Sequence, residues 1–552
     1  MGADDRTKIG QKFASLRARL VRFSEDWPGL SAAVLGLVVA CGYPPLHGWW
    51  IALPALALFL VHCHRASSWR SAAWRGWAFG WAHLTLANNW IATAFTHQAK
   101  MPEFLGWVAV PLLCIYLAIY PALAAGIAHV AARRAGPMAY GSVFAAAWIV
   151  TEWLRSWVFT GYPWPPLGLV LLGDWQAQGL ARVLPWLGTY GLSGLAVLIA
   201  AGLWFAIHRR RAVLAVGLGA VIAGAMVWPA SNTAREGGIR YTLIQPLILQ
   251  SEINDPSKFE EQFLRIASLT AAGPTDQNAG QSRLVLWPES AIPDYLEDGY
   301  PQRYYRRTTY GADPALARAR IGSVIGPQAT LLTGVVNFNI AQRPDGIVGA
   351  VSARNSVVAL NGMGEVTHGY AKAHLVPYGE YLPMESLLGA IGLSRLTAGT
   401  VPFIPGPGPQ TFDLGVHGKA GIQICYEIVF SGQVVDRANR PDYLFNPSND
   451  GWFGAWGPPQ HLAQARMRAM EEGLPVLRST TTGISAVIDA DGVVRQSIAT
   501  GIAGKVEGVI PAAKSPTLFA KFGNALPLAW AALLALLGAG LPRLLALRAA
   551  RS

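Results

Sequence analysis

The stretch Ala420–Glu427 reads AGIQICYE, a β-prone apolar run that stops at a cysteine followed by two polar residues. Such a run predicts a strand that presents Cys425 at the edge of a sheet. The next backbone N–H would then be free to stabilise an oxyanion. A single cysteine is more often a small buried hydrophobic residue than a nucleophile, so the interpretation depends on its neighbours in the fold.

Two further motifs carry the partners that a thiol nucleophile needs. Glu289 lies in LVLWPES, directly after another β-prone run, and Lys372 lies in YAKAHLVPYGE. A carboxylate can accept the thiol proton, and an ammonium can stabilise the tetrahedral intermediate. Taken singly, Glu289 is typical of a surface turn and Lys372 of a solvated loop. Together with Cys425 they predict acyl transfer through a thioester.

All three residues lie in one polar insert, 230–522, whose ends we place near 231–238 and 511–515. The insert contains 24 Lys or Arg and 25 Asp or Glu, so it is close to neutral. Short β-prone runs such as YTLIQPLIL, ATLLTGVVNF and DYLFNPS alternate with helical patterns such as PPQHLAQARMRAMEEGLP. This alternation predicts a layered α/β or α+β domain.

The rest of the chain has the composition of a membrane protein. Of all 552 residues, 14% are charged and 52% are hydrophobic, whereas soluble domains average about 25% charged residues. Eight segments are candidate membrane spans. They are 29–46, 49–63, 76–97, 105–131, 139–158, 191–207, 212–229 and 523–541. We therefore predict a membrane domain in 1–229, the insert in 230–522, and a last span with a tail in 523–552.

The distribution of basic residues predicts the orientation. Connections on one side of the eight predicted spans carry 17 Lys or Arg, and the opposite short loops carry 2. Because basic loops stay in the cytoplasm, both termini are expected inside and the insert outside. The excess positive charge thus belongs to membrane topology. Nucleic-acid binding is not expected, since no basic patch with interleaved aromatic residues occurs.

The order Glu, Lys, Cys within WPE, KAHLVPYGE and CYE resembles the nitrilase superfamily, whose fold is an αββα sandwich. Set among predicted spans, the insert is similar to that of the apolipoprotein N-acyltransferases. TEWLRSWVFTGYPW, FNPSNDGWFG and QHLAQARMRAMEEGLPVLRSTTTG are similar to further motifs of that family. The resemblance implies Glu289, Lys372 and Cys425 as the catalytic triad, and it implies Glu380, Tyr426 and Glu427 as supporting residues.

The resemblance also implies a reaction and a location. A membrane phospholipid would donate an acyl chain to Cys425, and the N-terminal amine of a diacylglyceryl apolipoprotein would accept it. The enzyme would lie in a bacterial inner membrane with its catalytic domain in the periplasm, and it would need neither cofactor nor metal. One alternative is a membrane-anchored amidase of the nitrilase type that acts on a small C–N substrate. Another is a transporter with an inactive appended domain.

Several residues stay without an assigned role. Glu152 and Arg155 share one face of the fifth span, either as an ion pair near the outer interface, as a lipid headgroup contact or as a brace for the insert. Asn254 stands where the family usually has a tryptophan. The apolar segment 381–396 is interpreted as a buried helix or as a lid. A separate group is expected to be helix-surface or structural: His461, Arg466 and Arg468.

Overall fold

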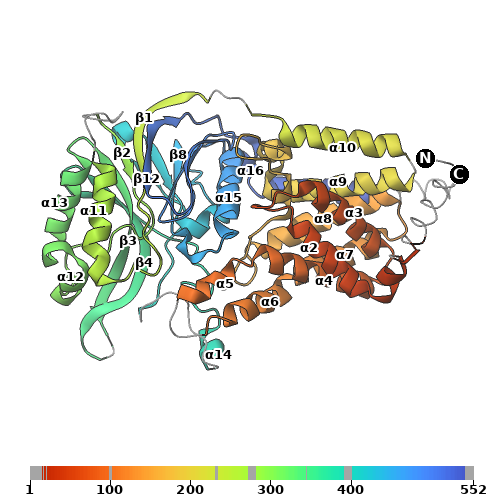
Figure 1. The fold of residues 1–552 in the computed structure, drawn as a ribbon, viewed down its shortest axis with the longest axis horizontal. Helices are drawn as coiled ribbons and strands as arrows, with labels where there is room; N and C mark the ends of the chain where they lie inside the picture. The colour runs from red at the N-terminus through yellow and green to blue at the C-terminus, as the bar shows by residue number, and fades with distance from the viewer. Residues whose placement is uncertain are drawn as a thin grey trace.

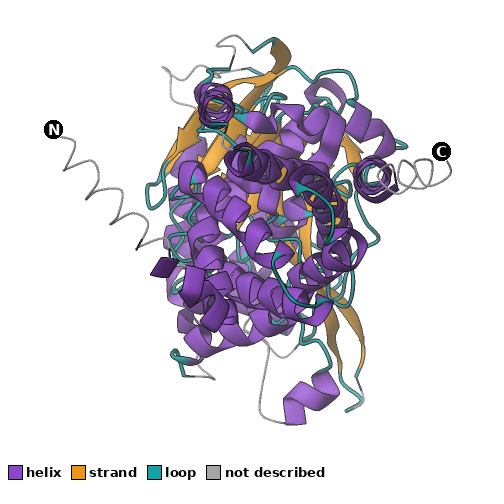
Figure 2. Ribbon diagram, turned by 90° about the vertical axis from the view of Figure 1, so that its right-hand side faces the viewer, coloured by secondary structure: helices purple, strands orange, loops and turns teal. Residues whose placement is uncertain are grey.

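The computed structural model describes residues 15, 18–19, 21–97, 102–209, 211–230, 234–271, 281–343, 345–390 and 401–540. The chain forms a helical part and a part with two β-sheets, which lie end to end along the longest axis (Figure 1). Viewed from the helical end, the helices stand in front of the strands (Figure 2). One helix of the insert, α15 (Gly457–Glu472), lies between the two parts.

The helical part is built from the N-terminal residues and a short C-terminal return. Its helices are α2 (Pro28–Ala40), α3 (Trp49–His64), α4 (Trp69–Ala87), α5 (Ile91–Ala94), α6 (Leu105–Leu117), α7 (Ile119–Ala132), α8 (Pro137–Arg155), α9 (Leu184–His208), α10 (Ala212–Val227), α16 (Leu518–Phe522) and α17 (Ala525–Ala535). Alanine-rich stretches let these helices approach closely, and the buried core between them contains Phe59, Phe79 and Phe144.

Each predicted span coincides with a helix of this part. Within the part of the chain that the structure describes, two stretches are long and apolar enough to cross a bilayer, Leu105–Ala132 with 28 residues and Leu180–His208 with 29. The first is α6 and α7 in succession, with Pro111 inside α6. Four more apolar helices have 10–17 residues. Eight spans, their orientation and the domain limits therefore stay predictions, and the predicted tail from 541 onwards lies outside the described residues.

The insert forms two six-stranded sheets with the same pattern of pairing. The first has the order β12-β1-β2-β3-β4-β5, and the second has the order β11-β10-β9-β8-β7-β6. In each sheet three neighbouring strands are parallel, β1, β2 and β3 in one and β7, β8 and β9 in the other. The strands are β1 (Glu236–Gln245), β2 (Leu284–Leu286), β3 (Thr330–Gln342), β4 (Val348–Asn361), β5 (Val366–Ala371), β6 (Thr411–Asp413), β7 (Lys419–Ile422), β8 (Tyr443–Ser448), β9 (Val476–Thr480), β10 (Ser485–Ile488), β11 (Val494–Ile498) and β12 (Gly504–Pro511).

The sheets pack face to face and carry helices on their outer faces. Apolar side chains from both sheets fill the middle, among them Leu243, Leu332 and Phe445. The outer face of the first sheet is covered by α11 (Phe259–Thr270) and α13 (Pro314–Ile325), with α12 (Gln302–Thr308) beside them (Figure 1). The outer face of the second sheet is covered by α15. This arrangement is the expected αββα sandwich.

Helix α15 differs from the sequence-based expectation. His461, Arg466 and Arg468 were expected to be helix-surface or structural residues, and each is at most 1% exposed. The reason is that α15 packs against the second sheet on one side and against α9 of the helical part on the other. The expectation that these residues lie on a helix surface is therefore wrong, whereas their structural character is retained.

Candidate active site

Cys425 lies just beyond the carboxyl end of β7, as the first residue of a short 3₁₀ turn, Cys425–Val429. Its φ is +51°, a left-handed conformation that residues with a side chain rarely adopt. Its carbonyl oxygen accepts hydrogen bonds from His461 Nε2 at 3.1 Å and from Asn446 Nδ2 at 3.3 Å. The thiol-bearing residue is 5% exposed, so the surrounding protein fixes both its backbone and its environment.

Glu289 lies in the turn that follows β2, where the WPES motif predicts it. Its Oε1 accepts a hydrogen bond from Asn355 Nδ2 at 2.7 Å, and its Oε2 accepts one from the backbone N–H of Asn449 at 2.8 Å. Asn449 follows β8 of the second sheet. The carboxylate therefore spans the gap between the two sheets and faces the residues that follow β7 and β8.

Lys372 follows β5 and is buried, at 2% exposed. Its Nζ lies 2.9 Å from Glu380 Oε2 and 3.8 Å from Glu289 Oε1. Burial by itself would lower the pKa of Lys372, but Glu380 and then Glu289 outweigh burial and raise that pKa. Lys372 is thus a permanent cation between two carboxylates.

The surroundings disfavour the charged form of the Cys425 side chain, whereas they favour the charged form of Lys372. Burial, and then the negative charge of Glu289, raise its pKa well above the ordinary value, while Lys372 and a hydrogen bond from the Asn449 backbone pull it down. The resting sulfur is therefore a thiol. A thiol of this kind becomes nucleophilic only when a base removes its proton during attack, and Glu289 is the carboxylate that acts on it most strongly.

Glu427 fastens the segments that carry the lysine and the cysteine to one another. Its Oε1 accepts hydrogen bonds from Tyr370 Oη at 2.7 Å and from the backbone N–H of Ala373 at 2.6 Å, next to Lys372. Its Oε2 accepts one from the backbone N–H of Ile424 at 2.7 Å, next to Cys425. Burial raises the pKa of Glu427 to about 7.

Glu380 and Tyr426 support the site from two sides. Glu380 pairs with Lys372 and accepts hydrogen bonds from Asn355 Nδ2 at 3.0 Å and Val376 N at 2.8 Å. Tyr426 packs edge-on against Phe430, with ring centroids 5.1 Å apart, in a buried cluster that also contains Trp90 and Trp164 of the helical part. The six residues singled out in the sequence are all buried, and Tyr426 faces the helical part from the same turn that carries Cys425.

Two asparagines of this site were missed in the sequence. Asn355 bridges Glu289 and Glu380, and Asn449 joins Glu289 to the loop after β8. Asn449 stands in the quoted motif FNPSNDGWFG, which is a usable signal. Asn355 gave no comparable signal, because it stands between Arg354 and Ser356 in a polar stretch of β4.

Glu152 and Arg155 act within the helical part as a brace. Arg155 Nη2 lies 3.7 Å from Glu152 Oε1, and the guanidinium donates to the carbonyls of Trp164 and Pro165. Trp164 Nε1 in turn donates to Gln460 Oε1 of α15 at 2.7 Å. These contacts contain the expected ion pair, and they also connect it through Trp164 to the insert, as a brace would.

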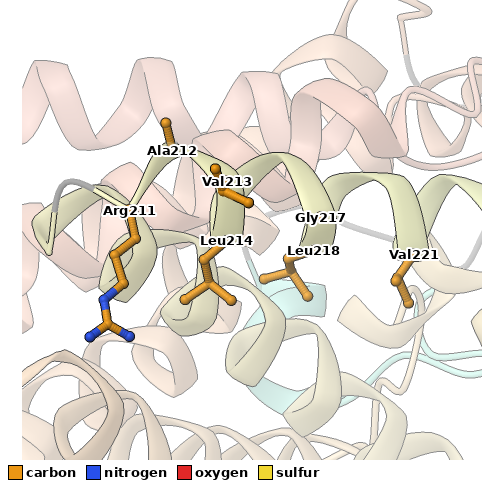
Figure 3. Close-up of a pocket in the computed structure, with 7 residues that line it drawn as sticks. All are labelled: Arg211, Ala212, Val213, Leu214, Gly217, Leu218 and Val221. Carbon is orange, nitrogen blue, oxygen red and sulfur yellow. The ribbon is translucent and has the colours of Figure 1, made fainter.

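The pocket with the largest volume among those described lies apart from these residues. A concavity of about 850 Å³ runs along α10 and is lined by six uncharged residues and Arg211 (Figure 3). It lies on a single helix of the other part and contains no nucleophile. The described residues contain no group of three His, Cys, Asp or Glu side chains that could hold a metal ion. Within the predicted lid, a short helix α14 (Glu385–Ala390) is described, and 391–396 lies outside the described residues.

Comparison with known families agrees with this architecture. Residues 35–202 match the family model described as the apolipoprotein N-acyltransferase N-terminal domain, and 248–501 match the model described as carbon-nitrogen hydrolase. Among solved structures, a variant of the Nesterenkonia amidase of the nitrilase superfamily is 17% identical. It covers 51% of this chain and 94% of its own, with a TM-score of 0.34.

Relatives that match almost end to end carry one name. The apolipoprotein N-acyltransferase of Rhodopseudomonas palustris is 31% identical over 89% of this chain and 91% of its own length. That of Nitrosomonas europaea is 31% identical over 92% of this chain and 96% of its own. That of Bradyrhizobium diazoefficiens is 32% identical over 86% and 87%. The chain therefore belongs to the apolipoprotein N-acyltransferase family.

Proposed function

We propose that the protein is a membrane acyltransferase that moves a fatty acyl chain from a phospholipid to the N-terminal amine of a diacylglyceryl-cysteine on an apolipoprotein. The observation that carries this proposal is the buried group of Glu289, Lys372 and Cys425, with Glu380 and Glu427 around it. Family membership supports the acceptor, because the relatives bear that activity in their names.

The first half of the reaction acylates the enzyme. Glu289 removes the thiol proton while the sulfur of Cys425 attacks the ester carbonyl of the phospholipid. Lys372 and a backbone N–H stabilise the oxyanion. The bond between the carbonyl carbon and the glycerol oxygen then breaks, and Glu289 returns its proton to that oxygen. Lysophospholipid leaves, and a thioester remains on Cys425.

The second half transfers the chain to nitrogen. The α-amino group of the modified cysteine attacks the thioester, and Glu289 accepts a proton from the nitrogen. The carbon–sulfur bond breaks, the thiol is restored, and the product is an amide. Both substrates are anchored in lipid, so the eight predicted spans and an extracytoplasmic insert would hold the site where both can reach it.

The test follows the acyl chain. Purified protein is incubated with phospholipid labelled in its acyl chain, and the peptide that contains Cys425 is analysed by mass spectrometry. We expect a base-labile adduct on Cys425 that disappears when a diacylglyceryl-cysteine peptide is added, as an amide forms. Cys425→Ser and Cys425→Ala should fold and form no acyl adduct. Ammonia release from small amides without any adduct would favour the amidase alternative.

A further inference from the structure

The polar network beneath Cys425 is more extensive than the proposed chemistry requires. His461, Asp450 and Arg478 are at most 2% exposed. Arg478 Nη2 donates to both oxygens of Asp450 at 2.7 Å and lies 2.9 Å from His461 Nδ1. On the other side of the ring, His461 Nε2 lies 3.1 Å from the Cys425 carbonyl oxygen. Buried polar groups of this kind fix a structure when every partner is satisfied.

These partners determine the tautomer of the imidazole. A carbonyl oxygen can only accept, so Nε2 must carry the proton that bonds Cys425. Nδ1 lies 2.9 Å from Arg478 Nη2, which can donate to it, and 3.1 Å from Asp450 Oδ1, which can only accept. In a neutral ring Nδ1 therefore accepts from Arg478, and the Asp450 carboxylate is satisfied by Arg478. Burial, and then the positive charge of Arg478, lower the pKa of His461, which agrees with a neutral ring.

We infer that His461 is a positioning residue that fixes the Cys425–Tyr426 peptide unit, and through it the direction of the nucleophile and of the Tyr426 N–H. The inference rests on the proposed function. At a φ of +51° the Cys425 backbone is held by its surroundings alone. Because the C=O and N–H of a trans peptide point in opposite directions, a carbonyl bound to His461 turns the Tyr426 N–H away from α15.

The imidazole is itself held from the helical part. Its ring centroid lies 5.1 Å from that of Trp164 and 5.6 Å from that of Phe453, so aromatic faces restrict its rotation. The preceding residue, Gln460, accepts from Trp164 Nε1 and donates to the carbonyls of Ala87 at 3.1 Å and Pro44 at 3.3 Å. Residues of the helical part therefore hold the turn of α15 that carries His461, and His461 in turn holds the backbone of Cys425.

A pair of variants separates positioning from packing. In His461→Gln the amide nitrogen lies near the position of Nε2 and can still donate to the Cys425 carbonyl. In His461→Asn the amide lies near the position of Nδ1, so it faces Arg478 and Asp450 but does not reach Cys425. Both replacement side chains are neutral and polar, and both lack the ring that packs against Trp164. Each variant is therefore the control for the other.

Two measurements on the full chain in detergent compare them. The first is acylation of Cys425 by labelled phospholipid as a function of lipid concentration. We expect His461→Asn to lower the maximal rate about a hundredfold without changing the half-saturating concentration, because an error of about 1 Å in geometry costs about that factor. We expect His461→Gln to stay within about tenfold of the wild type.

The second measurement needs no lipid, so it decides the inference even if the proposed reaction is wrong. The rate of alkylation of Cys425 by iodoacetamide is followed against pH at the level of its peptide. We expect the profile of His461→Asn to move to higher pH, since a relaxed backbone takes the sulfur away from Lys372 and the Asn449 N–H, while Glu289 and Asp450 remain nearby. The inference is overturned if His461→Asn matches the wild type, or if His461→Gln and His461→Asn are impaired equally.

Discussion

Single side chains in this protein orient groups that lie on different strands. Asn355 of β4 illustrates this: one amide group donates to Glu289 at 2.7 Å and to Glu380 at 3.0 Å. Glu289, Lys372 and Cys425 could be predicted from the sequence because each follows a recognisable run or motif. Asn355 could not, because its role depends on which two carboxylates the fold brings within reach of one amide.

Replacing Asn355 should therefore impair chemistry more than folding. Asn355→Leu removes the amide that donates to both Glu289 and Glu380. Of the two groups that contact both carboxylates, only Lys372 then remains. A lost hydrogen bond to a charged group costs about 1.5–3 kcal/mol, or about ten- to a hundredfold in the acylation rate of Cys425. Asn339→Leu on the neighbouring strand β3 is the control, since Asn339 bonds only Ser352 among the contacts found for its amide. Equal acylation by both variants would contradict the role given to Asn355.

Glu427 makes the stability of the fold depend on pH. Its pKa is raised from 4.5 to about 7 in the folded protein, mainly by burial. Between these values the unfolded chain has lost the proton that the folded chain keeps, so the free energy of unfolding falls as pH rises. The total fall from this group is about 3 kcal/mol and is complete above pH 7.

The variant Glu427→Gln tests this sign. Glutamine does not titrate, so the decline of the thermal midpoint between pH 5 and 7.5 should become shallower. Burial also raises the pKa of Glu472 to about 7 and raises the pKa values of Glu471 and Asp294, so these groups contribute to the decline that remains. The exposed Glu365→Gln serves as the control and should leave the slope unchanged. A slope in Glu427→Gln as steep as in the wild type would disprove the assignment.

At the scale of elements, the sequence predicts what has a local pattern. In the sequence, apolar or alternating stretches are visible where the strands β1, β2, β3, β4, β7, β8 and β10–β11 form. Helical patterns are visible where α11 and α15 form. Strands β5, β6, β9 and β12 were not predicted, nor were α12 and α13. Thus β5 reads VTHGYA and β6 has three residues, and their strand state comes from pairing with a neighbour.

The spacing between elements can be tested at Gly334 of β3. A Cβ there would lie 2.7 Å from Glu289 Cα and 2.8 Å from Ser290 N, which are backbone atoms that cannot rotate away. Gly334→Ala should push the Glu289 turn off the strand and lower the acylation rate by about a hundredfold, because the base would be displaced by a large part of 1 Å. The effect is measured as adduct formation on Cys425.

Gly369→Ala in β5 provides the matched control. A Cβ at Gly369 meets nothing within 4 Å, and the substitution also replaces a glycine in a strand of the same sheet. We expect Gly369→Ala to keep the wild-type acylation rate. If Gly334→Ala behaves in the same way, the close approach of the turn to β3 has no importance for the reaction.

At the scale of the whole molecule, α15 belongs to both parts. It forms the outer layer of the second sheet, and its Ala463, Met467 and Met470 join the core of the helical part. A helix buried on both sides is expected to be apolar all round. Here the polar side chains instead find partners on each side, and the sequence pattern alone could not tell a surface role from a structural one.

Arg466 shows how strongly the two parts depend on each other. Its guanidinium donates to the carbonyls of Gly173, Asp174 and Ala177, in the loop between α8 and α9, at 2.7–3.0 Å, and to that of Gly492 of the insert at 2.7 Å. Burial lowers the pKa of Arg466 to about 10, so it remains charged at neutral pH. One side chain therefore satisfies carbonyl groups on both sides of the boundary.

Removing the Arg466 side chain should weaken the contact between the helical part and the insert. Arg466→Met leaves the buried carbonyls of Gly173, Ala177 and Gly492 without this donor, while the Asp174 carbonyl keeps the backbone N–H of Ala177. The loss should lower the free energy of unfolding by at least about 3 kcal/mol. Arg466→Lys should recover little of it, because an ammonium cannot reach carbonyls in the directions of a planar fork. The measurements are the thermal midpoint in detergent and the rate of limited proteolysis near 173–177. Arg343→Met, which removes an exposed pair with Asp345, should change neither, and an Arg466→Met protein as stable as that control would show that the joint is held by its apolar contacts alone.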